Sequence, residues 1–496
     1  MAERGALVGW SIAGLFVVGG CFADAAMEDV PGPDATTDGT ADGATDDSVD
    51  ATAATSGSSV DGVESDDGNA SGSSGGSTEG NTEPSSTGAP PADADRDGFD
   101  ALEDCDDEDA TIHPDAPEIC DLVDNDCDGV VDFGLSVPTH FATIGDALDA
   151  AVVGDHLCVG PGTYAEALFI AIGVQLESVE GSATTIINPA ADDRAVRIAD
   201  ATDVRLTGFS IRGGVGPHGS GLTVSESTGV VLEDLVLHDN VALNPGLSCQ
   251  GAAIRIGSSE VAARRIYAFD NSMDDCRYGG GVVHVRDSTA TFDNLAIVGN
   301  DQAVGESVDA ALNIIDSDTT ISNLVVAGNT ASATINNYGI AIKYAGAGSH
   351  ALTNATVTRN TAVAEFIRRG AVYFDGNAAA PLEVALVNVA NTDNVGGPGP
   401  GYGLGGGNVE LSFHHTNTSG NEPESFGPTI ADPTGVDGNI AVDPNYMDTA
   451  SLNPVNWDLT LAPGSGMING GTPALLDPDA SVSDIGAFGG PNADAW

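Results

Sequence analysis

The sequence predicts an all-β solenoid for residues 136–496, preceded by a small acidic module and a disordered tether. Units such as VVLEDLVLHDN and ATFDNLAIVGN recur, with alternating apolar residues and a final Asn. The 65 glycines suit the corners between short strands. The central apolar residues lie 26, 31, 29, 29 and 31 residues apart, at Phe209, Leu235, Ile266, Leu295, Leu324 and Ala355.

The alternation and the repeat length exclude two other repeat architectures. A period of two residues argues against helical repeats, which need a period near 3.6 residues. A propeller blade would need about 40–45 residues and four strands. Each unit instead contains a second short strand before the alternating one, as in GLTV and GVVHV. Two or three strands per unit indicate a coil that stacks on the next.

The first 20 residues have the features of an export signal. Their apolar run is shorter than the ~20 residues that a membrane span requires. The sequence VGGC, ending at Cys21, resembles the lipobox of bacterial lipoproteins. This resemblance implies lipid on Cys21 and a position at the bacterial outer membrane or cell surface, with the ectodomain extracellular or periplasmic. An ordinary signal peptide with a chance cysteine is the alternative.

Residues 21–92 are expected to form a disordered tether. The segment 24–92 contains no Lys or Arg and is rich in Ser, Gly, Thr, Asp and Ala. Such a segment cannot bury enough apolar surface to offset its ordering entropy. Repulsion between its acidic residues favours extension. A lipid anchor followed by a long tether would hold a folded domain away from a membrane.

The module at residues 93–135 opens with DADRDGFDALED, residues 93–104. Gly at the sixth position permits a sharp turn, and the spacing resembles an EF-hand calcium loop with Asp in place of Glu at position 12. The shorter Asp side chain weakens the expectation of bidentate closure. The expected ligands are the carboxylates of Asp93, Asp95, Asp97 and Asp104 and the carbonyl of Phe99.

A second loop, DNDCDGVVD, repeats this arrangement and resembles thrombospondin type 3 calcium repeats. Its expected ligands are Asp124, Asp126, Asp128 and Asp132. A solvated acidic linker is the alternative, but the 17 Asp and Glu residues of segment 93–132 would repel one another without a counter-ion. Hard oxygen ligands without a zinc-type His/Cys set indicate Ca²⁺ as the cofactor.

The whole stretch, with its DCDD…EICD…DNDCDG skeleton, also resembles a metal-binding motif of secreted bacterial proteins. One protein with this motif is a copper-binding surface protein of methane oxidisers. The copper assignment does not carry over, because this stretch lacks Trp and has a single His.

Six cysteines remain after Cys21, an even number that predicts disulfides in an exported protein. Cys249 and Cys276 occupy nearly the same point on consecutive units, and coils ~4.8 Å apart allow a disulfide between them. We expect at least one bond within residues 105–127, and a bond to Cys158 is an open possibility. Free, small core residues are the alternative for Cys249 and Cys276.

The repeat resembles the right-handed parallel β-helix of pectate lyases and many surface proteins. The resemblance covers residues 137–496 and implies a helix, carrying Ile144, Leu148 and Ala151 on one face, that caps the N-terminal end of the core. The C-terminal segment resembles the endings of bacterial β-helix surface proteins. Stacked coils would form an asparagine ladder from Asn240, Asn271, Asn300, Asn329 and Asn360.

The formal net charge of −59 argues against nucleic acid as a partner and against direct contact with anionic membranes. We expect a monomer that meets the membrane only through its lipid. The favoured role is structural or ligand-binding, with a polysaccharide or another surface component as the ligand. The alternative is an extracellular polysaccharide lyase or hydrolase. Its candidate residues are sparse: Asn391-Thr392-Asp393 matches one fragment of a polygalacturonase pattern, and possible charged groups are Lys343, Glu365, Arg368 and Arg369.

Overall fold

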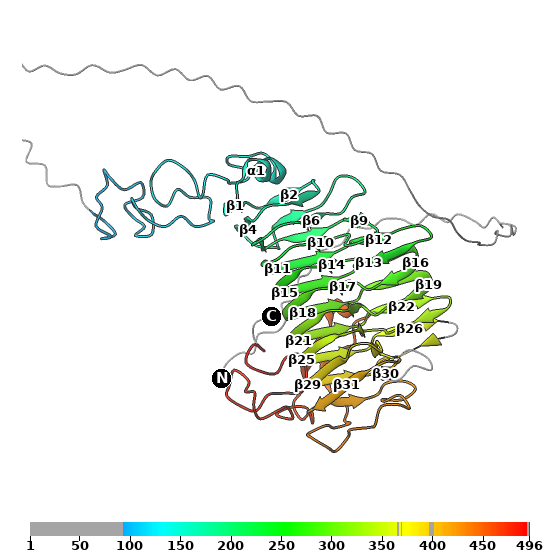
Figure 1. The fold of residues 1–496 in the computed structure, drawn as a ribbon. Helices are drawn as coiled ribbons and strands as arrows, with labels where there is room; N and C mark the ends of the chain where they lie inside the picture. Colours follow the sequence, from blue (N-terminus) through cyan, green and yellow to red (C-terminus); the bar gives the residue numbers. More distant parts are fainter. Residues whose placement is uncertain (1–92, 365–366, 369, 396–400, 494–495) are drawn as a thin grey trace, which may run out of the picture. The chain divides into compact units, whose positions relative to one another are not determined.

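The computed structural model describes residues 93–496 except 365–366, 369, 396–400 and 494–495. The predicted signal peptide, Cys21 and the tether lie outside the described residues. The regular structure is almost entirely β, as predicted, and successive strands stack along the chain (Figure 1). Within the described part of the chain, no helix has the length and apolar character needed to span a bilayer.

The first of three parallel sheets contains the alternating strands of the repeat. It comprises β1 (His156–Val159), β4 (Gln175–Ser178), β7 (Arg205–Thr207), β11 (Val230–His238), β15 (Glu260–Phe269), β18 (Thr289–Val298), β21 (Asp318–Ala327), β25 (Gly348–Thr358), β29 (Leu382–Thr392) and β31 (Val409–His414). Four short strands join it at the side: β2 (Gly162–Tyr164), β5 (Thr185–Ile187), β8 (Ser210–Arg212) and β32 (Asn417–Ser419).

The second sheet contains the short strand that precedes each alternating strand. Its members are β3 (Leu168–Ile170), β6 (Val196–Ala199), β10 (Leu222–Ser225), β14 (Ile254–Gly257), β17 (Val283–Arg286), β20 (Leu312–Ile315), β24 (Ile342–Gly346), β28 (Val372–Gly376) and β30 (Tyr402–Leu404).

The third sheet follows the asparagine corner. Its members are β9 (Val215–Gly216), β12 (Val241–Leu243), β13 (Ser248–Gln250), β16 (Ser272–Gly280), β19 (Asp301–Val308), β22 (Thr330–Ala333), β23 (Asn336–Asn337), β26 (Thr361–Ala364) and β27 (Ile367–Arg368). The described residues also contain one antiparallel pair, β33 (Tyr446–Asp448) with β34 (Asp458–Leu461), and the 3₁₀ helix η1 (Pro454–Asn456).

The predicted register between coils is confirmed. Leu235 pairs with Ile266, Ile266 with Leu295, Leu295 with Leu324 and Leu324 with Ala355. These side chains are buried in one continuous apolar core. The coils begin earlier than the repeat pattern indicates, because β1 already pairs with β4.

The asparagine ladder is present and longer than predicted. Asn240, Asn271, Asn300, Asn329 and Asn360 are all buried, and each Nδ2 donates to the Oδ1 of the next at 2.9–3.0 Å. Asn394 and Asn421 continue the row. A second ladder runs through Ser227, Ser259, Ser288 and Ser317, where each backbone N–H donates to the next Oγ at 3.1 Å.

The N-terminal helix α1 (Ile144–Ala150) packs against the core as expected. Its buried residues are Ile144, Ala147 and Leu148, whereas Ala151 is the C-cap rather than part of the helical face. The Thr143 side chain caps the first turn by accepting from the Asp146 N–H. The carboxylate of Glu166 accepts from the backbone N–H groups of Ile144 and Gly145 and ties the helix to the coils.

The C-terminal segment folds back onto the outer side of the first sheet. Leu459 and Ala487 pack with Val298, Val325 and other small residues of β18 and β21. The amide of Asn323 donates to the carbonyls of Ala487 and Gly489. At Gly328, with φ +63°, a Cβ would lie 2.4 Å from Pro454, so this contact requires glycine. The segment thus covers the later coils.

Candidate metal-binding module

Two disulfides hold the module that precedes the β-helix. Cys105 bonds to Cys127 across the two acidic loops, which confirms the bond expected within residues 105–127. Cys120 bonds to Cys158 on β1 and links the module to the first coil. Because these sulfurs are oxidised, none of the four can serve as a thiolate ligand. Metal binding here must therefore use oxygen and nitrogen atoms.

The first loop brings three predicted ligands together. One carboxylate oxygen each of Asp93, Asp95 and Asp97 lies within 4.8 Å of the others. The sequence produces this arrangement through Asx turns. Asp95 Oδ1 accepts from the Asp97 N–H at 3.2 Å, and Asp97 Oδ1 accepts from the Phe99 N–H at 2.9 Å. The second oxygens, Oδ2 of Asp95 and of Asp97, are buried and have no hydrogen-bond partner.

The pKa of Asp95 is raised, first by burial and then by the charges of Asp97, Asp104 and Asp93. Asp104 is buried, and its Oδ1 accepts from the Asp106 N–H while its Oδ2 is also buried without a partner. Repulsion between these carboxylates, with unpartnered oxygens among them, fits a bound cation. The Phe99 ring stacks on His113 at 5.1 Å, and the role predicted for its carbonyl stays a prediction.

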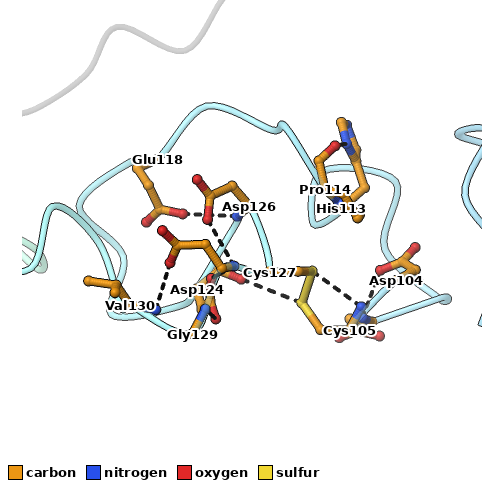
Figure 2. Close-up of a disulfide and its surroundings, with 12 residues drawn as sticks. Asp104, Cys105, His113, Pro114, Glu118, Asp124, Asp126, Cys127, Gly129 and Val130 are labelled. Atoms are coloured by element: carbon orange, nitrogen blue, oxygen red, sulfur yellow. Dashed lines mark hydrogen bonds between the residues drawn. A yellow bond between two sulfur atoms is a disulfide. The ribbon is translucent and has the colours of Figure 1, made fainter. Parts of the chain in front are cut away.

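The second loop adds a candidate ligand that the sequence did not predict. Carboxylate oxygens of Glu118, Asp124 and Asp126 lie within 4.8 Å of one another (Figure 2). Glu118 Oε1 accepts from the Asp126 N–H at 2.9 Å, whereas its Oε2 is buried without a partner. Burial, followed by the charges of Asp126 and Asp124, raises the pKa of Glu118. Its position two residues before Cys120, in EICD, was the available signal.

Two residues predicted as ligands in this loop have other contacts. Asp132 lies outside the cluster, because its Oδ1 accepts from the N–H groups of Asp121 and Leu122 and its Oδ2 accepts from Ser136 Oγ. It therefore orders the backbone around the loop rather than completing it. Asp128 Oδ1 accepts from the Val130 N–H at 2.7 Å and shapes the turn that Gly129 permits, with φ +91°. The structure does not bring Asp132 into the cluster, and its role as a ligand stays a prediction.

The residues present suit a hard cation. Each loop offers three clustered carboxylates, and buried oxygens without a partner belong to Asp95 and Asp97 in the first loop and to Glu118 in the second. The histidines nearest the loops already have partners: His113 Nδ1 lies 2.9 Å from the Pro114 carbonyl, and His156 Nε2 lies 2.9 Å from Glu177. Soft-metal coordination would need free thiolates or a convergent imidazole set.

On the β-helix, the predicted disulfide between Cys249 and Cys276 is confirmed, with Cα atoms 5.8 Å apart. Among the described residues, the candidate catalytic residues do not assemble into a site. Asn391 and Thr392 are buried in β29, and Asn391 Nδ2 donates to the Gly401 carbonyl. Lys343 pairs with Asp309 at 2.6 Å. Glu365 and Arg369 lie outside the described residues, and the side chain of Arg368 is likewise not described.

Fold and module together define a β-helix protein with an N-terminal metal-binding motif, and comparison with known proteins agrees. Residues 104–132 match the family described as "Putative metal-binding motif", and residues 194–379 match a right handed beta helix region. The chain thus contains both features that the sequence predicted, in the predicted order. A search of curated proteins finds no match.

Two solved structures are similar to this chain, with little sequence identity and low TM-scores. Pectate lyase Pel9A is 13% identical, with 70% of this chain and 90% of that chain covered and a TM-score of 0.32. PfbA, a surface adhesin of Streptococcus pneumoniae, is 11% identical, with 59% of this chain and 92% of that chain covered and a TM-score of 0.22.

Proposed function

We propose that this chain is an exported, lipid-anchored surface protein whose module at residues 93–135 binds calcium and whose β-helix binds a surface ligand. The observation that supports the calcium site is the set of buried carboxylate oxygens without partners: Asp95 Oδ2, Asp97 Oδ2, Asp104 Oδ2 and Glu118 Oε2. A buried, unpaired acceptor costs roughly 1–3 kcal/mol, and more when it is charged. A cation removes this cost at every such oxygen.

Calcium is favoured over copper by the donors. Carboxylate oxygens are the preferred ligands of Ca²⁺, which accepts irregular geometry and six to eight ligands. Three carboxylates per loop leave the remaining positions to backbone carbonyls and water. Copper prefers imidazole or sulfur donors, and the module's three cysteines are committed to disulfides with one another or with Cys158 of β1.

The position of the module in the chain suggests its role. It follows the expected tether and is covalently bonded to β1 through Cys120 and Cys158. A module ordered by calcium would connect the tether to the first coil through a folded unit. The capping helix would then not fray where the tether is attached. The β-helix would then present a rigid surface to its ligand, since each coil is fixed to the next by strand pairing and by the two ladders.

Protease protection of the full chain tests the calcium proposal. Calcium at a hundredfold excess over its dissociation constant stabilises the form that binds it by about 2.7 kcal/mol. Cleavage within residues 93–135 should therefore slow about a hundredfold relative to chelator. Glu118→Gln should lose much of this protection. Glu108→Gln, an exposed acid of the same module, is the matched control and should retain it.

Equal cleavage of the wild-type module with calcium and with chelator would contradict the proposal. Protection by Cu²⁺ but not by Ca²⁺ would assign the motif to a different metal. Cleavage is measured on the full chain, both inside and outside the module. A folding defect in the Glu118 variant would therefore show as faster cleavage outside the module.

One cluster on the β-helix favours the second candidate, a glycoside hydrolase. Asp239 and Asp270 follow the paired residues His238 and Phe269 on neighbouring coils. A hydrogen bond from His238 lowers the pKa of Asp239, whereas burial and the Asp239 charge raise the pKa of Asp270. Carboxylates with opposite shifts can serve as base and acid. Glycan cleavage that Asp270→Asn abolishes would support this candidate, and cleavage that survives in this variant would remove it.

A further inference from the structure

One surface of the β-helix collects cationic side chains in a chain that has 15 Lys and Arg against 74 Asp and Glu. The surface is the corner between the third sheet and the second sheet. The central residues of successive second-sheet strands stand in register and point away from the core, since their neighbours on each strand are buried in it. This row contains Arg197, Thr223, Arg255, His284, Asn313 and Lys343.

The side chains of the row lean back over the corner that precedes their own strands. Thr223 Oγ1 donates to the Gly219 carbonyl, and Arg255 Nε donates to Gln250 Oε1 at 3.2 Å. His284 Nδ1 lies 2.8 Å from the Gly280 carbonyl. Glycine at the corner makes room for them: a Cβ on Gly219 would lie 3.1 Å from Arg255 Cβ. The floor of the corner is therefore mainly backbone.

Three basic residues from consecutive coils lie close together at one end of this corner: Arg194, His218 and Arg255. We call this group of three residues the basic corner. His218 forms a β-bridge with Gln250 of the next coil, and the Gln250 side chain accepts from Arg255 Nε. Arg194 reaches towards the following coil, where a Cβ on Gly216 would lie 3.1 Å from its Cγ. All three side chains are half-buried.

Most other arginines of the described residues are neutralised. Arg205, Arg264 and Arg265 share Glu233, and Arg277 pairs with Glu306 at 2.9 Å. By contrast, neither Arg194 nor Arg255 takes part in any ion pair within the described part of the chain. The carboxylate that acts on Arg255 is Asp287 of the next coil, which is itself paired with Arg286.

The electrostatic consequence is mutual repulsion that Asp287, which is paired with Arg286, offsets only in part. Burial, together with the charges of Arg194 and Arg286, lowers the pKa of Arg255. Burial and the charges of Arg255 and Arg194 lower the pKa of His218. Buried polar atoms without a hydrogen-bond partner also lie here. One is Nδ1 of His218 in the basic corner, and two others, His284 Nε2 and Asn313 Oδ1, belong to the row of second-sheet residues. His284 and Asn313 are 1% and 0% exposed.

We infer that the basic corner binds an acidic glycan, whose carboxylate or sulfate groups pair with Arg194 and Arg255. This inference rests on the proposed ligand-binding role of the β-helix. It specifies where the ligand binds and that the ligand is negatively charged. Bidentate pairing with guanidinium suits both anionic groups. The Debye length of about 8 Å at physiological salt screens the distant acidic residues, so the local cations decide the interaction.

A glycan fits this corner better than an acidic polypeptide does. The strands on both sides continue into paired sheets, so the corner offers no free strand edge to an extended peptide. Its lining is backbone and polar side chains, without the apolar pocket that anchors a typical protein hot spot. Neighbouring coils lie about 4.8 Å apart, so Arg194 and Arg255, which are two coils apart, are separated by about 10 Å along the solenoid axis, a spacing that suits a chain of regularly spaced charges.

The test measures binding of the full chain to four polymers: polygalacturonate, dextran sulfate, neutral dextran and polyglutamate. We expect one or both of the acidic glycans to bind, and their separate dissociation constants identify the preferred anionic group. Arg255→Gln should weaken this binding about tenfold or more, as expected for loss of a charge-assisted hydrogen bond. Arg264→Gln removes an equal charge from an arginine paired with Glu233 and should change binding less than twofold.

The possible failures are distinct. Glycan binding that Arg255→Gln and Arg194→Gln leave unchanged would overturn the assignment to this corner but preserve a ligand-binding β-helix. Polyglutamate binding as tightly as the acidic glycans would overturn the choice of glycan, and equal binding of neutral dextran would overturn the role of charge. Absence of binding to all four polymers would contradict both the corner and the ligand-binding role. Equal melting temperatures of the variants exclude misfolding as the cause.

Discussion

Replacing Asn300 in the middle of the asparagine ladder should destabilise the β-helix strongly. The Asn300 side chain is 1% exposed, and its Nδ2 donates to the Ala268 carbonyl at 3.0 Å and to Asn329 Oδ1 at 2.9 Å. Its Oδ1 accepts from the backbone N–H of Asn271 at 2.9 Å and from the Asn271 amide at 3.0 Å. The side chain thus satisfies backbone groups of two coils at once.

The cost of Asn300→Ala can be worked from these contacts. The variant leaves the Asn271 N–H buried without an acceptor, which costs about 1–3 kcal/mol, and loses further bonds worth about 1 kcal/mol each. We therefore expect the free energy of unfolding to fall by about 4 kcal/mol. Urea unfolding followed by circular dichroism measures this as a lower midpoint at unchanged slope.

Asn336→Ala is the matched control, because Asn336 is half-buried and its Nδ2 makes one bond, to Ser307 Oγ at 3.2 Å. We expect it to cost less than about 1 kcal/mol. If both variants unfold at the same urea concentration, the ladder does not contribute as described. A changed slope for Asn300→Ala would instead show that coils unfold separately.

Three other predictions concern the anchor, the coil disulfide and the C-terminal segment. Cys21→Ser should release the protein from membranes and abolish fatty-acid labelling, and membrane attachment that persists without label would contradict lipidation. The double variant Cys249→Ser/Cys276→Ser opens a link across 27 residues and should lower the free energy of unfolding by about 3.5 kcal/mol, whereas an unchanged urea midpoint would deny the bond a stabilising role. Burial, then the charges of Asp484 and Asp479, raises the pKa of Asp477 to about 6, so its contribution to stability is complete below about 4 and lost as pH rises through 6. The free energy of local opening near Asp477, obtained from hydrogen exchange corrected for the intrinsic exchange rate, should therefore be lower at pH 7.5 than at pH 5. The expected difference is about 1 kcal/mol after allowance for solvent screening, and Asp477→Asn should remove it.

The coils were predictable from sequence because alternation and repeat length constrain a solenoid closely. An inward position such as Leu295 must pair with the inward positions of both neighbouring coils, so spacing alone gives its partners. The same argument located the asparagine ladder and placed Cys249 opposite Cys276. In each case one coil dictates the environment of the next.

The module was predicted less completely, because its contacts are irregular. Asp124 and Asp126 follow from loop spacing, but Glu118 joins them through a bend between Cys105 and Cys127 that no periodicity reveals. Asp132 has the position of a ligand in sequence, yet neighbouring backbone N–H groups compete for its carboxylate. Local hydrogen bonding of this kind is decided by the backbone path.

The packing of the C-terminal segment and the basic corner could not be read from sequence either. The contact between Asn323 and Ala487 joins residues 164 positions apart, outside any repeat. The neutralisation of Arg264 and the absence of an ion pair at Arg255 depend on which face each strand presents. Formal charge describes the chain as a whole, whereas the corner is a local exception to it.

Isothermal titration of calcium into the chelated full chain tests most directly whether both acidic loops bind this ion. We expect two sites per chain, with Asp97→Asn losing the first and Asp126→Asn losing the second, because each removes one carboxylate of a three-carboxylate cluster. Heat from two sites in the wild type and from one site in each variant would agree with the structure. No calcium heat in the wild type, or two sites retained in both variants, would contradict it.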